Sequence, residues 1–275
     1  MLDVTMATKA MEVTLKEEIA VRITEISKLP GRVGGIMETS KLPEKIERVS
    51  TNAQPISQDA EPDQPESNAG EQETEPDILP EDFLTNEQIE TIRSKYKKLG
   101  YSDEEIEAKV KEYALKAKIC KEAEEKGLEN LTETEKGNYG EMKTDLDMLD
   151  KGYVRISKDS VTSLNGGHTG IDGVYENPDG KPRYIIVESK YRDDGNGSLN
   201  PKPTTEGKQM DDNWTFGNNL DKAVGKDKAD EIRLEKMTNP DNVGKTLATI
   251  DRDGNVKYES IDQNANIEKE KDVFK

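Results

Sequence analysis

The sequence predicts an α/β fold in which one mixed central sheet is flanked by helices. Two observations support this class. Apolar residues recur at helical spacing in one segment before the expected strands and in a second segment between them, and short β-rich runs lie on both sides of the second segment. The expected order of helix, strands, helix and strands is carried by residues 139–149, then 153–156, 171–175 and 183–188, then 206–237, and finally 246–250 and 256–261.

The composition indicates that packed core does not fill the whole chain. Hydrophobic residues make up 31% of the 275 residues, charged residues 36%, and the formal net charge is -18. Residues 51–82 contain ten acidic residues, five prolines and no Lys or Arg, which is typical of a disordered linker. We therefore expect a partly helical segment at 1–50, an acidic linker at 51–82, a helical hairpin at 83–136 and the main domain at 137–275.

Capping signals predict the hairpin. Thr85 is suited to the N-cap of a first helix, a turn follows at residues 99–102, and Ser102 with Glu105 forms a capping box that begins a second helix. Apolar residues at helical spacing in that second helix predict a buried stripe. We interpret the hairpin as a packing or adaptor element.

Several classes of protein are disfavoured. The single cysteine, Cys120, excludes an intramolecular disulfide framework. The first residues lack the basic start and apolar run of a cleaved secretion signal, and no stretch has the length and apolarity of a membrane span. Most of the excess negative charge precedes residue 137, which weakens the objection that an acidic chain repels nucleic acid.

The strongest chemical signal lies in two expected strands. Glu188 and Lys190 are two residues apart on a strand and should project from the same face, while Asp172 can face them from the paired strand. Two carboxylates and an amine at a strand edge suit a divalent metal with a lysine beside an attacking water. A structural ion pair at the sheet edge is the alternative, and the Glu-x-Lys triplet alone favours it.

Three further features strengthen the catalytic interpretation. Glu141 follows Gly137 near the expected start of the first helix of the domain. His168, the only histidine, precedes Asp172 by four residues. Gln209 opens the expected helix after the triplet, and that helix also carries the sole tryptophan, which we expect to pack in the core.

Taken together, these motifs resemble the PD-(D/E)xK nuclease superfamily. Within it, they resemble the nuclease domains at the C-termini of bacterial polymorphic toxins, including contact-dependent growth-inhibition toxins. The matching segments are a Gly-x-x-Gly-Glu helix at 137–141, a Gly-Ile-Asp-Gly strand at 170–173, the Glu-x-Lys strand at 188–190 and a Lys-Gln-Met helix start at 208–214. The resemblance covers about residues 137–260 and implies a restriction-endonuclease-like core.

The resemblance also implies roles for individual residues. Asp172 and Glu188 would bind a divalent metal, most simply Mg²⁺ with Mn²⁺ or Zn²⁺ as alternatives, and Glu141 would be a further ligand or a supporting carboxylate. Lys190 would orient or activate water and stabilise charge on the phosphate, and Gln209 would orient the site.

Other polar residues have less specific expectations. His168 is open between metal ligation, phosphate contact, proton transfer and an ordinary place in a loop. Five basic residues close to the triplet in sequence could hold a phosphate backbone or simply be solvated. They are Lys181, Arg183, Arg192, Lys202 and Lys208.

The implied function is hydrolysis of phosphodiester bonds in DNA or tRNA by a metal-dependent endonuclease, most simply the toxic domain of a bacterial antagonism system. Such a toxin would leave the cell through a specialised secretion system, act in the cytoplasm of the target cell and require an immunity protein in its producer. Two alternatives stay open. One is a restriction or repair endonuclease of a mobile element, and the other is a non-catalytic interaction module built on the acidic linker and the hairpin.

Overall fold

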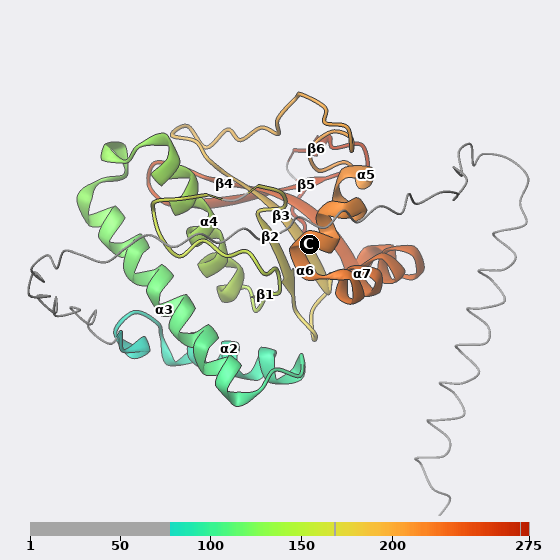
Figure 1. Cartoon of the computed structure of the whole chain (residues 1–275). Coiled ribbons are helices and arrows are strands. Elements are labelled where there is room, and N and C mark those ends of the chain that lie inside the picture. Colours follow the sequence, from blue (N-terminus) through green and yellow to red (C-terminus); the bar gives the residue numbers. More distant parts are fainter. Residues whose placement is uncertain (1–77, 168, 270, 275) are drawn as a thin grey trace, which may run out of the picture. The chain divides into compact units, whose positions relative to one another are not determined.

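The computed structural model describes residues 78–167, 169–269 and 271–274 (Figure 1). They belong to one compact unit that extends from Gly70 to Lys275. Its centre is a six-stranded sheet in the order β1-β2-β3-β4-β5-β6. The strands are β1 (Val154–Arg155), β2 (Gly173–Glu176), β3 (Tyr184–Tyr191), β4 (Val243–Ile250), β5 (Val256–Ile261) and β6 (Ile267–Glu268). Helices flank this sheet, so the predicted α/β class is confirmed.

The sheet is mixed because one pair of strands is parallel. β3 and β4 run parallel, and every other neighbouring pair is antiparallel. The β3–β4 crossover contains the elements α5 (Asp212–Trp214), η3 (Thr215–Asn219), α6 (Leu220–Val224), α7 (Lys226–Thr238) and η4 (Pro240–Asn242). β3 therefore lies inside the sheet, between β2 and β4, as its β-rich apolar run indicates, and the alternative of an ion pair at a sheet edge does not fit this position.

The two faces of the sheet are covered by different helices (Figure 1). On one face, Ile185 and Val187 of β3 pack with Met148 of α4 (Glu133–Asp150). On the other face, Tyr184 and Ile186 join a core cluster with residues of α6 and α7. Because side chains alternate along a strand, the side chains after Val187 also point in turn to one face and then to the other, up to the C-terminal end of β3.

The predicted helical hairpin is present as α2 (Asn86–Lys98) and α3 (Asp103–Lys126). Each begins with a capping box, Thr85 with Gln88 and Ser102 with Glu105. The hairpin shares a hydrophobic cluster with α4 and β1, and the Tyr96 hydroxyl donates a 2.6 Å hydrogen bond to the carbonyl of Arg155. The hairpin is therefore part of the same folded unit as the sheet.

Three predicted boundaries were wrong. α4 begins at Glu133 rather than near residue 139, because Thr132 and Glu135 form a capping box and the helix continues through Gly137. The boundary expected between 136 and 137 thus falls inside a helix. The continuous helical pattern expected at 206–237 is instead a loop followed by short helices, since Met210 adopts a positive φ of 67° and Gly225 one of 84°.

The N-terminal predictions fall largely outside the described residues. The segment 1–50 and the linker up to residue 77 are not described. The last residues assigned to the linker are folded, since Pro80–Asp82 form the 3₁₀ turn η1 and Ile78 packs against the hairpin cluster. In the part of the chain that is described, no helix combines the length and apolarity needed to cross a bilayer.

Candidate active site

Glu188, Lys190 and Gln209 meet at the C-terminal end of β3. Glu188 and Lys190 lie on the same side of the strand, and Lys190 Nζ donates a hydrogen bond to Glu188 Oε1. Gln209 comes from the loop before α5, and its Nε2 donates to Glu188 Oε1 at 2.7 Å, while its Oε1 accepts from the backbone N–H of Asn200 at 2.9 Å. The amide is therefore held from both ends, and the predicted association of the three side chains is confirmed.

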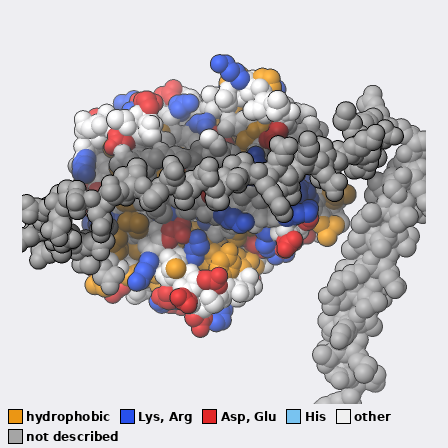
Figure 2. All heavy atoms as spheres, viewed as in Figure 1, with side chains coloured by type: hydrophobic (Ala, Val, Ile, Leu, Met, Phe, Trp, Pro, Cys, Tyr) orange, Lys and Arg blue, Asp and Glu red, His pale blue; other side chains and the backbone are white. Residues whose placement is uncertain are grey.

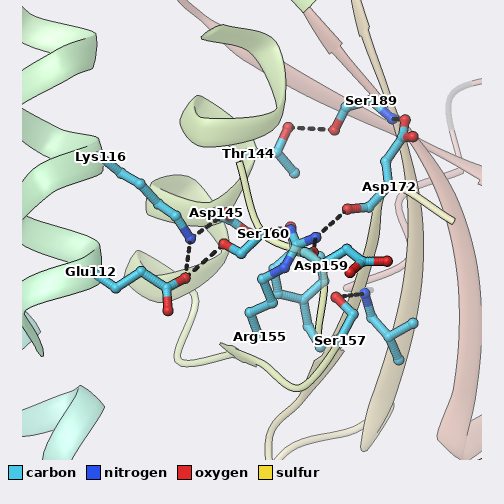
Figure 3. A network of polar contacts seen from close by, with 12 residues as sticks. Glu112, Lys116, Thr144, Asp145, Arg155, Ser157, Asp159, Ser160, Asp172 and Ser189 are labelled. Carbon is cyan, nitrogen blue, oxygen red and sulfur yellow. Dashed lines mark hydrogen bonds and ion pairs between the residues drawn. The ribbon is translucent and has the colours of Figure 1, made fainter. Parts of the chain in front are cut away.

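Asp172 approaches the same group from the segment that precedes β2. Its Oδ2 accepts a 2.8 Å hydrogen bond from the backbone N–H of Ser189, the residue between Glu188 and Lys190 (Figure 3). The sequence placed Asp172 on the paired strand, whereas β2 begins one residue later. The expected convergence still holds, because the charge of Asp172 acts on the carboxyl group of Glu188.

Glu141 lies in the middle of α4, so its predicted place near a helix N-terminus was wrong. It nevertheless faces the site. Burial raises the pKa of the Glu141 carboxyl to about 9, and the Asp172 carboxylate contributes to this shift. A group with that pKa keeps a proton at neutral pH. Glu141 can therefore hold a proton next to the site without adding another negative charge.

Burial and the nearby acidic groups also raise the pKa of the Glu188 carboxyl. The side chain is 1% exposed, and burial together with the Asp172 charge raises its pKa to about 8, although Lys190 acts in the opposite direction. Burial lowers the pKa of the Lys190 ammonium, but Glu188 and Asp172 outweigh it, and the pKa of Lys190 lies above its ordinary value. Lys190 is consequently a fixed cation and a donor.

The donor set suits a hard divalent cation. Glu188 Oε2 is buried and receives no hydrogen bond from the described residues. Mg²⁺ commonly binds through one or two carboxylates and keeps several waters, and Asp172 and Glu188 would supply such a pair. Among the residues that the structure describes, no group of three or more His, Cys, Asp or Glu side chains is arranged as a metal site. The pair therefore fits Mg²⁺ or Mn²⁺ better than a zinc site with three protein ligands.

The five basic residues proposed for phosphate binding divide into two groups. Arg183 immediately precedes β3, about 16 Å from Glu188 along the strand direction. It pairs with Glu176 at 2.6 Å and with Glu231 at 2.9 Å, and Lys181 lies nearby in the β2–β3 connection. These two residues lie at the opposite end of β3 from Glu188, and Arg183 is held by two carboxylates. Their contact with a phosphate backbone stays a prediction.

The other three basic residues lie toward the site end of β3. Arg192 follows β3 directly, Lys208 precedes Gln209, and Lys202 belongs to the loop between them. On the face shown in Figure 2, basic and acidic side chains are interspersed outside the grey region. This distribution favours local contacts to a phosphate over attraction by a broad positive surface.

Two remaining predictions concern aromatic and imidazole side chains. His168 lies outside the described residues, and its role stays a prediction. Trp214 is buried in the core cluster beneath α6 and α7, and its backbone N–H is capped by Asp211 at 2.8 Å. The expectation that Trp214 packs in the core is confirmed.

Sequence reasoning missed a buried group of charged residues next to the site. Arg155 reads as the solvent-facing position of an alternating strand, yet it is 1% exposed because the hairpin covers it. Lys116 and Asp145 are equally buried and occur in helices so rich in charge that nothing distinguishes them in the sequence. Only the tertiary contact between α3, α4 and β1 identifies these residues.

Comparisons with known proteins identify no relative. No protein-family model matches the chain, and neither the curated proteins nor the solved structures contain a significant match. The chemistry of the site has to be inferred from its own side chains.

Proposed function

We propose that this chain is a metal-dependent nuclease that hydrolyses phosphodiester bonds in DNA or tRNA. One observation carries the proposal: Asp172, Glu188, Lys190 and Gln209 come from three separate segments and meet at the end of an interior strand. Burial of such a set is costly for folding stability unless a ligand or a partner compensates it. Perturbed carboxyl pKa values in one cluster are typical of functional sites.

Asp172 and Glu188 would hold the cation, and a bound Mg²⁺ or Mn²⁺ would polarise a phosphate oxygen and lower the pKa of water. Gln209 keeps the Glu188 carboxylate in place through its 2.7 Å hydrogen bond. Lys190 remains protonated, so it donates hydrogen bonds to water or phosphate oxygen and offsets negative charge that develops at the phosphorus. It is poorly suited to remove a proton.

Glu141 and Glu188 would bind and release protons at the site. Each carboxyl keeps a proton at neutral pH in the cation-free chain, since its pKa is about 9 and about 8 respectively. Binding a cation favours the ionised form of a carboxyl group, so a proton is expected to leave Glu188 when the site is loaded. Glu141, whose pKa responds to the Asp172 charge, is a second group that can accept or return a proton.

The biological setting follows from the motif resemblance described above. We propose that the nuclease acts as the toxic domain of a bacterial antagonism system and that its producer carries an immunity protein. Expression inside a bacterium is then expected to arrest growth, and Glu188→Gln should relieve the arrest. Growth arrest that is as strong with Glu188→Gln as with the unchanged chain would contradict this setting.

The activity is tested with the purified full chain, plasmid DNA and total tRNA, in Mg²⁺, Mn²⁺, Zn²⁺ or EDTA. Cleavage is expected with Mg²⁺ or Mn²⁺ and not with EDTA. Asp172→Asn and Lys190→Met should each reduce the rate by about 100-fold or more, as expected for loss of a group that acts in the transition state. The control is Lys97→Met, which breaks an exposed ion pair with Asp103 at 2.6 Å on the helical hairpin.

Lys97→Met should leave cleavage unchanged, since this pair joins α2 to α3 and contacts none of the four site residues. Cleavage that persists in EDTA would refute the metal mechanism. Full activity in Asp172→Asn or Lys190→Met would refute the assignment of the site.

A further inference from the structure

A buried polar network joins the helical hairpin to the backbone of Asp172 (Figure 3). Lys116 of α3 donates to Asp145 Oδ2 of α4 at 2.8 Å, and Arg155 of β1 donates through Nη1 to Asp145 Oδ1 at 3.0 Å. Tyr175 of β2 also donates to Asp145 Oδ1, at 2.6 Å. Asp145 is thus the acceptor for three different elements, and none of the three charged residues is solvent-exposed.

Arg155 connects this network to the candidate site. Its Nη2 donates to the carbonyl oxygen of Asp172 at 2.6 Å and also to the carbonyl of Asp159. The guanidinium therefore spans a carboxylate on α4 and two points of the chain that leads into β2. A planar group with several fixed donors is suited to such bridging, whereas a lysine ammonium cannot reproduce its geometry.

The segment before Asp172 has little regular structure to hold it. The described residues between β1 and β2 form no helix and no strand, and Gly170 adopts a φ of 123°, which is rarely accessible to other residues. The position of the Asp172 carboxylate therefore depends on contacts made from outside its own segment. The carbonyl of Asp172 held by Arg155 is one such contact, and the Ser189 N–H on its carboxylate is another.

We propose that Arg155 is a positioning residue that fixes the backbone at Asp172 so that its carboxylate lies beside Glu188. Asp145 and Lys116 hold Arg155 in turn, which makes α3 of the hairpin a functional part of the site. The effect on catalysis rests on the proposed nuclease function. The effect on the geometry of Asp172 does not.

The experiment uses Arg155→Lys in the full chain, with two readouts. The first is hydrogen exchange of the Ser189 amide by NMR, because this N–H donates to Asp172 Oδ2, with other amides of β3 and β4 as internal references. The second is plasmid and tRNA cleavage in Mg²⁺. We expect Ser189 protection to fall about tenfold relative to the reference amides, and kcat to fall about 10- to 100-fold with KM nearly unchanged, since small misplacements are costly in this range.

Arg233→Lys is the matched control. Arg233 also donates to two backbone carbonyls, those of Phe216 and Gly217, and to the carboxylate of Asp221. None of these partners belongs to the site. This variant should leave Ser189 protection and cleavage within about twofold of the unchanged chain.

Wild-type protection of Ser189 in Arg155→Lys would overturn the proposal, as would an equal loss of protection in Arg233→Lys. If the unchanged chain cleaves neither DNA nor tRNA, the proposed function fails while the amide readout still decides the role of Arg155. Should Arg155→Lys not fold, Lys116→Gln weakens the same network at a greater distance from Asp172. It is judged on Ser189 protection by the same criteria.

Discussion

Replacing Glu188 by Gln is expected to stabilise the chain at alkaline pH. The pKa of this carboxyl is about 8 in the folded chain and about 4.5 in an unfolded one. The folded state therefore binds more protons between these two values, and the contribution of Glu188 to stability falls as the pH rises from 4.5 to 8. Above pH 8 the buried side chain is ionised next to Asp172, and this unfavourable state is the one that Gln avoids.

The size of the stability change follows from the difference between the two pKa values of Glu188. At about 1.4 kcal/mol per pH unit, the ionised carboxyl costs up to about 5 kcal/mol of folding free energy above pH 8. Removing it also leaves Lys190 without its nearest partner. Lys190 is 25% exposed and still faces the Asp172 charge, so this loss is about 1 to 2 kcal/mol. The net gain at pH 9 is therefore about 3 to 4 kcal/mol, and near pH 5.5 the variant should differ little from the unchanged chain.

Urea unfolding at pH 5.5 and pH 9, with EDTA present so that no cation contributes, measures both values. Glu259→Gln is the control, since Glu259 is 7% exposed and its pairing with Lys257 resembles the Glu188–Lys190 pair. It should not gain stability at pH 9. If Glu188 were only a structural partner of Lys190, its replacement would destabilise the chain at pH 9. Destabilisation of more than about 1 kcal/mol there would refute the electrostatic account of the site.

Three further outcomes are expected. Lys116→Met should lower the free energy of unfolding by about 3 to 5 kcal/mol, because it leaves Asp145 with one cation in the interior. Breaking the exposed Lys97–Asp103 pair by Lys97→Met should cost less than about 1 kcal/mol. Similar urea midpoints for the two variants would contradict this. A chain of residues 137–275 should show no cooperative thermal transition by circular dichroism, since it lacks α2, α3 and the first turn of α4. A chain of residues 70–275 should melt as one unit. A cooperative transition in the shorter chain would show that the hairpin is dispensable. Mg²⁺ or Mn²⁺ at about 100 times its dissociation constant should stabilise the unchanged chain by about 2.7 kcal/mol and Asp172→Asn by much less, and equal shifts in melting temperature would place the cation elsewhere.

Local patterns were sufficient to predict the part of the site that lies on β3. Glu188 and Lys190 share a face because the strand period is two, and this period does not depend on the rest of the fold. The Thr85 N-cap of α2 and the Ser102–Glu105 capping box of α3 are equally local and were also predicted correctly. Gln209 was recognised from its motif, although the structure places it in a loop with a positive φ at Met210 rather than in a helix.

Long-range packing determines what the sequence could not reveal. The alternation of residues 153–156 does not identify Arg155 as a buried cation, because its burial comes from the packing of the hairpin against β1. Glu141 was placed at a helix end because Gly137 was interpreted as a break, whereas the Thr132 capping box starts the helix earlier. Arg183 was close to the triplet in sequence but is separated from Glu188 by most of the length of a strand.

The parallel pairing of β3 with β4 has a consequence for how the site forms during folding. β2 and β3 are joined by a short connection and can pair early, but Tyr184 meets its β4 partner Val243 only 59 positions later in the chain. Contacts with such separation slow folding. Refolding from urea should therefore restore β-hairpin signals before cleavage activity, because Glu188 lies on a strand whose second neighbour, β4, arrives late. Under the proposed nuclease function, this order would keep a newly made chain inactive until its core is nearly complete.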